Sequence, residues 1–392
     1  MGGLQYLSIE MIFRIGSLLI LIFVLSTVSA QDKKLKEFKN FKEIESETLF
    51  WFKGYTRPKL SVDNGNPSVY FVDRFAGKTL NYTLVSCDLN RLELEKNLPK
   101  FPENLSISNL EKYNSNVSFI ESDKFSVIVG YGIIYIFEIE NSVKGQKMSY
   151  VLKDSILTNG CSGEETVFLN KNKLIIIDKL QPKLITEGGI RVSSFNLKTG
   201  KLKKEKTFKD LSSMLFYYDE NYSYCTVTHK YIYLYDVSNN SMVRINHNFK
   251  MQKTIKLDLP KGQKYFKSLN QYMGTTKLMD TVQTISKSIS RVINSTPMNE
   301  DVFFISQISE GDSIRLKCEI LKENGSIVAQ QFPQSELKIM SQGKLLFYCD
   351  KLYCLSAFGN LNLLDESLTQ NNLMSAIYNE KPHLGIYVFN LD

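Results

Sequence analysis

Histidine and tryptophan are scarce in this chain of 392 residues, which has three histidines and one tryptophan. His229, His247 and His383 lie far apart in the sequence, and no Cys/His set has the spacing of a metal site. A nucleophile elbow, a phosphate-binding loop, a zinc-binding helix motif and an EF-hand loop are also missing. The sequence therefore predicts no catalytic residue, no metal ligand and no cofactor.

Long apolar runs are absent except near the N-terminus. Residues 18–25 (LLILIFVL) precede a small-residue cleavage pattern at 28–30 (Val-Ser-Ala), as in a secretory signal peptide. The run is too short for an uncleaved membrane anchor, because a bilayer requires about 20 apolar residues. We predict a signal peptide over residues 1–30, a mature start at Gln31, and a secreted, extracellular product without stable membrane insertion.

Positive charge is in moderate excess, with 48 Lys and Arg against 41 Asp and Glu and a net charge of +7. Lysines cluster in a charged N-terminal arm, residues 31–47, and again at 198–206. A basic exported protein suits a sulfated or other anionic glycan, an anionic lipid or an acidic protein, whereas no motif suits nucleic acid. Lys198, Lys201 and Lys203 are therefore binding candidates; the alternative is that they form a solvated strand face.

A short strand ending recurs about seven times and closes runs of alternating apolar residues. The copies are Cys87-Asp88-Leu89, Phe137-Glu138-Ile139, Phe195-Asn196-Leu197, Tyr235-Asp236-Val237, Cys318-Glu319-Ile320, Leu355-Ser356-Ala357 and Phe389-Asn390-Leu391. Repetition of a hairpin every few tens of residues indicates a β-propeller. We predict an all-β fold: one propeller of about seven four-stranded blades over residues 48–392, with six blades as the alternative because the last two spacings are short.

The copies resemble generic propeller repeats of the WD40 or quinoprotein-like kind. Residues 195–202 (FNLKTGKL) are similar to the strand–turn–strand of quinoprotein-type repeats. The Gly-His and Trp-Asp signatures of WD40 units are missing, and Trp51 is the only tryptophan available for the docking positions of quinoprotein enzymes. The resemblance therefore implies the fold and carries over no cofactor or catalytic residue.

Two segments interrupt the regular pattern. The last copy ends right after its triplet, before a fourth strand, and an open edge is avoided in proteins. We expect a strand at residues 48–55 to supply the missing outer strand and close the ring. An insertion is expected at about 265–298, with apolar residues at helical spacing over 276–293. They indicate a helix packed on the ring or a partner-binding element, with an irregular loop as the remaining alternative.

Cysteines and sequons agree with an oxidising compartment. Cys349 and Cys354 flank an expected hairpin, so a local disulfide between them is one alternative. Cys87 and Cys318 replace Phe or Tyr in other copies, which predicts buried thiols. The candidate N-glycosylation sites are Asn81, Asn104, Asn116, Asn221, Asn239, Asn294 and Asn324.

Tyrosines form a last candidate surface. Tyr231, Tyr233 and Tyr235 alternate along one expected strand and therefore share a face, either as a binding surface or as packing between blades. We expect a secreted, non-enzymatic binding protein that recognises an extracellular protein or an anionic glycan through loops on one face of the ring. The alternative is an exported propeller enzyme acting on glycans or a small substrate at the central channel.

Overall fold

The computed structural model describes the part of the chain that forms the sheets. The described residues are 59–63, 66–73, 83–88, 93–95, 118–122, 124–130, 132–140, 149–158, 166–180, 189–209, 223–237, 239–260, 277, 280, 281, 284, 288–310, 313–356 and 385–391. The expected signal peptide (1–30), charged arm (31–47) and closing strand (48–55) lie outside them, so closure by an N-terminal strand stays a prediction.

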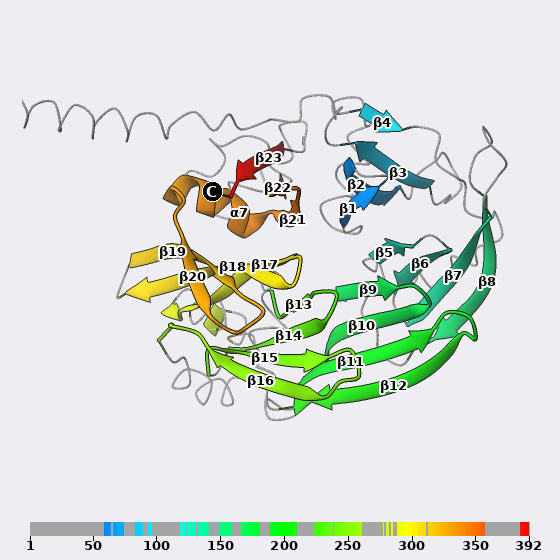
Figure 1. Ribbon diagram of the computed structural model, residues 1–392, viewed down its shortest axis with the longest axis horizontal. Coiled ribbons are helices and arrows are strands. Elements are labelled where there is room, and N and C mark those ends of the chain that lie inside the picture. The colour runs from blue at the N-terminus through cyan, green and yellow to red at the C-terminus, as the bar shows by residue number, and fades with distance from the viewer. Residues whose placement is uncertain are drawn as a thin grey trace, which may run out of the picture.

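The chain is a generic β-propeller of antiparallel sheets arranged around a ring (Figure 1). Five sheets have four strands each and are the blades. Blade 1 consists of β1 (Lys59–Asp63), β2 (Asn66–Asp73), β3 (Thr83–Asp88) and β4 (Glu93–Glu95). Blade 2 consists of β5 (Ser118–Glu121), β6 (Phe125–Gly130), β7 (Ile133–Glu140) and β8 (Ser149–Leu157). Blade 3 consists of β9 (Thr166–Asn170), β10 (Lys173–Leu180), β11 (Gly189–Asn196) and β12 (Lys201–Phe208).

The second half of the ring contains the remaining sheets and the helix. Blade 4 consists of β13 (Cys225–Val227), β14 (Tyr231–Asp236), β15 (Ser241–Asn246) and β16 (Met251–Lys256). Blade 5 consists of β17 (Arg291–Met298), β18 (Asp301–Glu310), β19 (Ser313–Leu321) and β20 (Ile327–Gln330). Helix α7 (Gln334–Gln342) leads into a three-stranded sheet of β21 (Lys344–Tyr348), β22 (Lys351–Ser356) and β23 (Gly385–Asn390).

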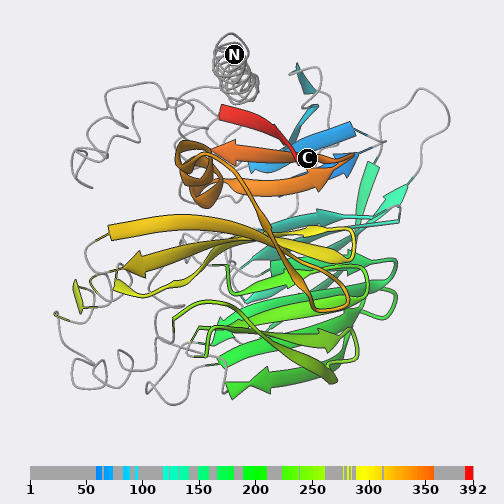
Figure 2. The ribbon, with the colours of Figure 1, turned by 60° about the vertical axis from the view of Figure 1, so that its left-hand side comes forward.

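The first strands of the sheets line the centre of the ring. They contact one another in the order β1, β5, β9, β13, β17 and β21, and β21 in turn contacts β1. The three-stranded sheet therefore lies between blade 5 and blade 1, and the two views in Figures 1 and 2 agree on this arrangement.

The expected number of blades was wrong. The described residues form five four-stranded blades, not seven or the alternative six. Two of the recurring triplets explain the overcount, because Leu355-Ser356-Ala357 begins at the end of β22 and Phe389-Asn390-Leu391 at the end of β23, its partner in the same three-stranded sheet. Each of these two triplets suggests a blade of its own, but both belong to the one three-stranded sheet, which leaves five four-stranded blades.

The core lies between the sheets, so central strands are buried on both faces. In β18, Val302 and Phe304 contact a cluster shared with blades 3 and 4, whereas Phe303 and Ile305 contact one shared with α7 and the three-stranded sheet. Side chains alternate across a strand, so one strand serves two interfaces. This double burial explains the near-continuous apolar runs of the repeats.

The segment expected as an insertion is only partly helical. Lys277, Asp280 and Ser288 are helical, but β17 begins at Arg291 and supplies the innermost strand of blade 5. The helix expected over 276–293 therefore ends earlier, and 291–298 belongs to a blade. Among the helices that the structure describes, none is long and apolar enough to cross a membrane.

Candidate functional site

An exposed lysine surface covers the outermost strands of blades 3 and 4. We call it the lysine face; its members are Lys198, Lys201, Lys203, Lys204, Lys206, Lys209, Lys250, Lys253 and Lys256. β12 and β16, which carry most of them, lie together at the lower edge of the ring in Figures 1 and 2. Within 198–209 and 250–256 the only acidic residue is Glu205. The three lysines predicted from the sequence therefore belong to a larger basic surface.

The lysine face is anchored by a turn of blade 4. Lys204 Nζ donates to the carbonyl oxygen of Asn248 at 2.6 Å, and Lys206 Nζ to that of Phe249 at 3.2 Å. Lys173, at the start of β10, donates to the carbonyl oxygen of His247. Three ammonium groups of blade 3 thus converge on three consecutive carbonyl groups of blade 4.

The aromatic ring of Phe249 lies beneath two of these ammonium groups. Phe249 is buried and has a φ of +61°, which turns its carbonyl group toward β12. Lys173 Nζ and Lys204 Nζ lie 5.9 and 5.6 Å from its ring centroid. Cation–π attraction and carbonyl dipoles therefore hold the ammonium groups in place without neutralising them.

The positive charges repel one another. Burial lowers the pKa of Lys173, and the charges of Lys203 and Lys204 lower it further. Across the described ranges, no carboxylate lies within ion-pair distance of these three lysines. The site can therefore accept an anion.

His247 lies at the inner side of the same turn. Its Nε2 lies 3.1 Å from the carbonyl oxygen of Thr228, and its pKa is lowered by burial and by the charge of Lys173. His229 and His247 both contact the ring of Phe168, at 6.3 and 5.2 Å between ring centroids. The fold thus brings together two histidines that are far apart in sequence, while His383 lies outside the described residues. No group of three His, Cys, Asp or Glu in the described residues could hold a metal ion.

The tyrosine stripe is packing, which corrects two of the binding candidates. Tyr233 and Tyr235 are buried, because β14 is a central strand with both faces covered, and only Tyr231 is half-buried. The guanidinium of Arg244 lies 4.5 Å from the Tyr231 ring centroid. Tyr233 and Tyr235 therefore cannot contact a ligand.

The local disulfide between Cys349 and Cys354, one of the alternatives for this hairpin, is not formed. Both are free thiols; Cys349 lies in the turn between β21 and β22 with a φ of +47°, and Cys354 pairs with Leu345 across the strands. The two cysteines do not face each other, because Cys349 is part of the two-residue turn and is exposed, whereas Cys354 lies within β22 and is buried. Cys318 is buried as expected, whereas for Cys87 the structure describes the backbone in β3 and not the side chain.

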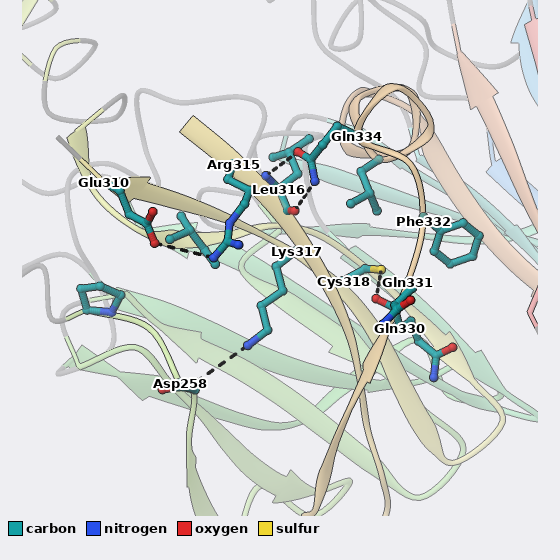
Figure 3. Close-up of a pocket in the computed structure, with 13 residues that line it drawn as sticks. Asp258, Glu310, Arg315, Leu316, Lys317, Cys318, Gln330, Gln331, Phe332 and Gln334 are labelled. Atoms are coloured by element: carbon teal, nitrogen blue, oxygen red, sulfur yellow. Dashed lines mark hydrogen bonds and ion pairs between the residues drawn. The ribbon is translucent and has the colours of Figure 1, made fainter. Parts of the chain in front are cut away.

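A pocket of about 590 Å³ lies beside β19, and we call it the β19 pocket (Figure 3). Its lining residues are Asp258, Pro260, Ile308, Glu310, Arg315, Leu316, Lys317, Cys318, Gln330, Gln331, Phe332, Gln334 and Leu337. No sequence pattern pointed to it, since these residues come from blades 4 and 5, from α7 and from the segment that leads into α7.

The charged groups of the β19 pocket are paired. Lys317 Nζ lies 2.8 Å from Glu319 Oε1 and 3.9 Å from Asp258 Oδ2, and Arg315 lies 3.6 Å from Glu310. Burial and the nearby Glu319 raise the pKa of the Cys318 thiol to about 12. That thiol is therefore protonated at neutral pH and is no nucleophile.

The sequons differ in what their side chains do. Asn294 Nδ2 donates to the carbonyl oxygens of Met340 and Gly343 at 2.7 and 2.8 Å, so it uses both of its hydrogens. Asn324 is exposed in the turn after β19, and its Oδ1 accepts from the backbone nitrogen of Ser326 at 2.8 Å. Asn239 is exposed, and its Nδ2 donates to Asp236 at 2.6 Å. The other four sequons (Asn81, Asn104, Asn116 and Asn221) lie outside the described residues.

These contacts predict selective glycosylation. In protein secreted by a eukaryotic cell we expect a glycan on Asn324 and none on Asn294, because a glycosylated amide keeps one hydrogen and cannot bond both carbonyl groups. Mass spectrometry of glycopeptides measures this occupancy. Asn324→Gln should leave the melting temperature unchanged, whereas a folded product with a glycan on Asn294 would contradict the assignment.

Comparison with known proteins gives only distant likenesses. No protein-family model and no curated protein matches the chain. Among solved structures, a DUF4221 family member from Bacteroides vulgatus has a TM-score of 0.49 and 10% identity, covering 86% of this chain and 93% of its own.

Two further structures are similar at a lower level. The β-propeller domain of the trilobed protease from Pyrococcus furiosus has a TM-score of 0.39 and 12% identity, covering 77% of each chain. A virginiamycin B lyase from Staphylococcus aureus has a TM-score of 0.35 and 11% identity, covering 83% of this chain and 92% of its own. These likenesses add nothing to the fold that the sheet topology establishes.

Proposed function

We propose that the chain is an exported, non-enzymatic binding protein that holds an anionic glycan on its lysine face. The observation that carries the proposal is that Lys173, Lys204 and Lys206 converge on one turn of blade 4, with the charge of Lys203 also acting on Lys173, and that no carboxylate among the described residues lies within ion-pair distance of them. An anion placed among these ammonium groups would relieve their mutual repulsion, so binding gains energy that a paired lysine could not supply. The predicted signal peptide supports export.

The surroundings favour a sulfated or carboxylated polysaccharide over a small ion. Lysines continue from the convergent group along β12 and β16, so a chain of anions has further partners. Leu202 and Met251 are 51% and 57% exposed among these lysines and offer apolar contacts to sugar rings. A linear polyanion would therefore bind along the two outer strands.

Heparin, a sulfated polysaccharide, is the probe for this proposal. We expect the mature chain to bind heparin and the triple variant Lys173→Gln, Lys203→Gln, Lys204→Gln to elute from it at clearly lower salt. The slope of log affinity against log salt should fall by about 2, because fewer counterions are released.

A matched triple variant separates the site from net charge. Lys230 and Lys322 form ion pairs with Glu323 and Asp301 at 3.1 and 3.0 Å, so changing them and Lys351 to Gln removes the same charge elsewhere. This control should retain most of the heparin affinity. If the two triple variants lose the same heparin affinity and have equal melting temperatures, the assignment of the binding site to the lysine face is wrong.

A further inference from the structure

The outer edge of β19 is only half paired. β20 pairs with Cys318 to Leu321, and among the described strands nothing pairs with residues 313–317 on that side. In the register of the two strands, Gln330 lies opposite Cys318, so residue 332 would lie opposite Leu316 if β20 continued. The strand stops instead, because Pro333 has no backbone N–H and the chain turns into α7.

A side-chain amide fills the place of the missing strand residue. Gln334 Oε1 accepts from the backbone nitrogen of Leu316 at 3.0 Å, and Gln334 Nε2 donates to the Leu316 carbonyl oxygen at 2.8 Å (Figure 3). One donor and one acceptor on the same residue reproduce the hydrogen-bonded pair of an antiparallel ladder. Since backbone groups alternate sides along a strand, those of Ile314 face the same outer edge.

We propose that the β19 pocket binds an extended peptide, which pairs antiparallel with β19 in line with β20 and displaces the Gln334 amide. The free length of β19, residues 313–317, spans about 14 Å and suits a peptide of about five residues. The volume of about 590 Å³ is within the range of ligand pockets. Backbone pairing would supply the affinity, as in other cases of strand addition. This proposal does not depend on the lysine face.

The two faces of β19 define which peptide fits. Leu316 packs against the cluster that contains Cys318 and Leu337, so a residue opposite Leu316 or Ile314 meets apolar side chains. Arg315 and Lys317 point to the other face, where Glu310 and Asp258 balance their charge. The ligand is therefore a segment in which apolar residues alternate with uncharged polar ones.

The probe is the peptide acetyl-Thr-Val-Thr-Val-Thr-amide with a fluorescent label, and its binding is followed by anisotropy. Its valines would lie opposite Ile314 and Leu316, with their backbone nitrogens directed at β19. Methylating both valine nitrogens should abolish binding, whereas methylating the inner threonine nitrogen should change the affinity less than 2-fold. Equal binding of both methylated peptides, or no binding by the unmodified peptide, would overturn the proposal.

Variants of the chain test the displacement step. Gln334→Ala should tighten binding about 5-fold, because the peptide no longer competes with two side-chain hydrogen bonds. The matched control Gln331→Ala, in the same pocket, should leave the affinity unchanged. Ile314→Pro should abolish binding while the melting temperature stays within a few degrees, because the lost N–H lies on the unpaired edge. If Gln334→Ala binds no better than the Gln331→Ala control, the amide is not the stand-in for a strand and the proposal fails.

Discussion

Replacing Arg191 with methionine should lower the free energy of unfolding by about 3–5 kcal/mol at pH 7, because it leaves a buried carboxylate without its partner. That carboxylate is Asp178, only 3% exposed in β10 and directly opposite Arg191 in β11. Arg191 Nε lies 3.2 Å from both carboxylate oxygens, and its terminal nitrogen also donates to one of them. Urea denaturation of both proteins gives the difference.

The pH dependence of this loss has a definite sign. Burial raises the pKa of Asp178 above its ordinary value, and Arg191 opposes that shift. Without Arg191 the pKa rises further, so the folded variant takes up a proton more readily than the unfolded chain does. The variant therefore loses most stability at pH 7. The difference in the free energy of unfolding between the variant and the wild type should become smaller as the pH falls from 7 to 5.

An exposed arginine provides the matched control. Arg315 pairs with Glu310 at 3.6 Å, and both side chains are 62% exposed, so Arg315→Met should cost less than about 1 kcal/mol. The double variant Asp178→Leu, Arg191→Met should recover most of the loss, since no buried charge remains. If Arg191→Met costs no more than Arg315→Met, the buried pair is not what stabilises blade 3.

Blade 3 shows what the sequence could predict. Alternation along the chain predicts its four strands at 166–170, 173–180, 190–197 and 201–208, and the structure has them within one residue of these bounds. The turns between β9 and β10 and between β11 and β12 are short and carry clear signals, such as Thr199-Gly200 with Gly200 at a φ of +62°. Alternation and turn chemistry, both local, were sufficient there.

Blade 4 shows why local patterns failed elsewhere. Alternation predicts strands at 222–229 as the second and at 241–249 as the last of four, but in the structure β13 (Cys225–Val227) is the first and β16 (Met251–Lys256) the last. Residues 214–220, which the pattern predicts as the first strand, lie outside the described residues. Tyr235-Asp236-Val237 lies at the end of a second strand, whereas the corresponding triplet in blade 3 ends a third strand. The position of a strand within its sheet depends on pairing between distant segments, which no short pattern encodes.

The candidate site was also only half visible in the sequence. Lys198, Lys201 and Lys203 were found because they are neighbours along the chain. Lys173 and the carbonyl groups of His247 to Phe249 were missed, because they reach the same place from other strands. The stand-in role of Gln334 had no signal at all, since it depends on where β20 ends relative to β19.

Asn240 is the residue at which a single change should disrupt the junction of blades 4 and 5. It is fully buried, and its Nδ2 donates to the carbonyl oxygens of Pro260 and Ser290, the latter at 3.2 Å. Its Oδ1 accepts from the hydroxyl of Tyr235, which in turn accepts from the backbone nitrogen of Val292 at 3.1 Å. Burial raises the pKa of Tyr235, so this hydroxyl keeps its proton and can donate. One side chain thus ties together three segments of the chain.

We expect Asn240→Ala to lower the free energy of unfolding by about 3 kcal/mol or more. Two buried partners, the Tyr235 hydroxyl and the Ser290 carbonyl oxygen, would lose a hydrogen bond, at about 1–3 kcal/mol for each buried group left unsatisfied, and the more exposed Pro260 carbonyl oxygen would lose a third. Alanine would also have to adopt the φ of +46° that asparagine tolerates here.

Asn240→Gly removes the same bonds without that backbone strain, so it should be less destabilising than alanine. The exposed neighbour makes Asn239→Ala the control, with a loss below about 1 kcal/mol. Denaturation curves for the three variants decide the matter: equal losses at positions 239 and 240 would show that the contacts of Asn240 do not stabilise the junction.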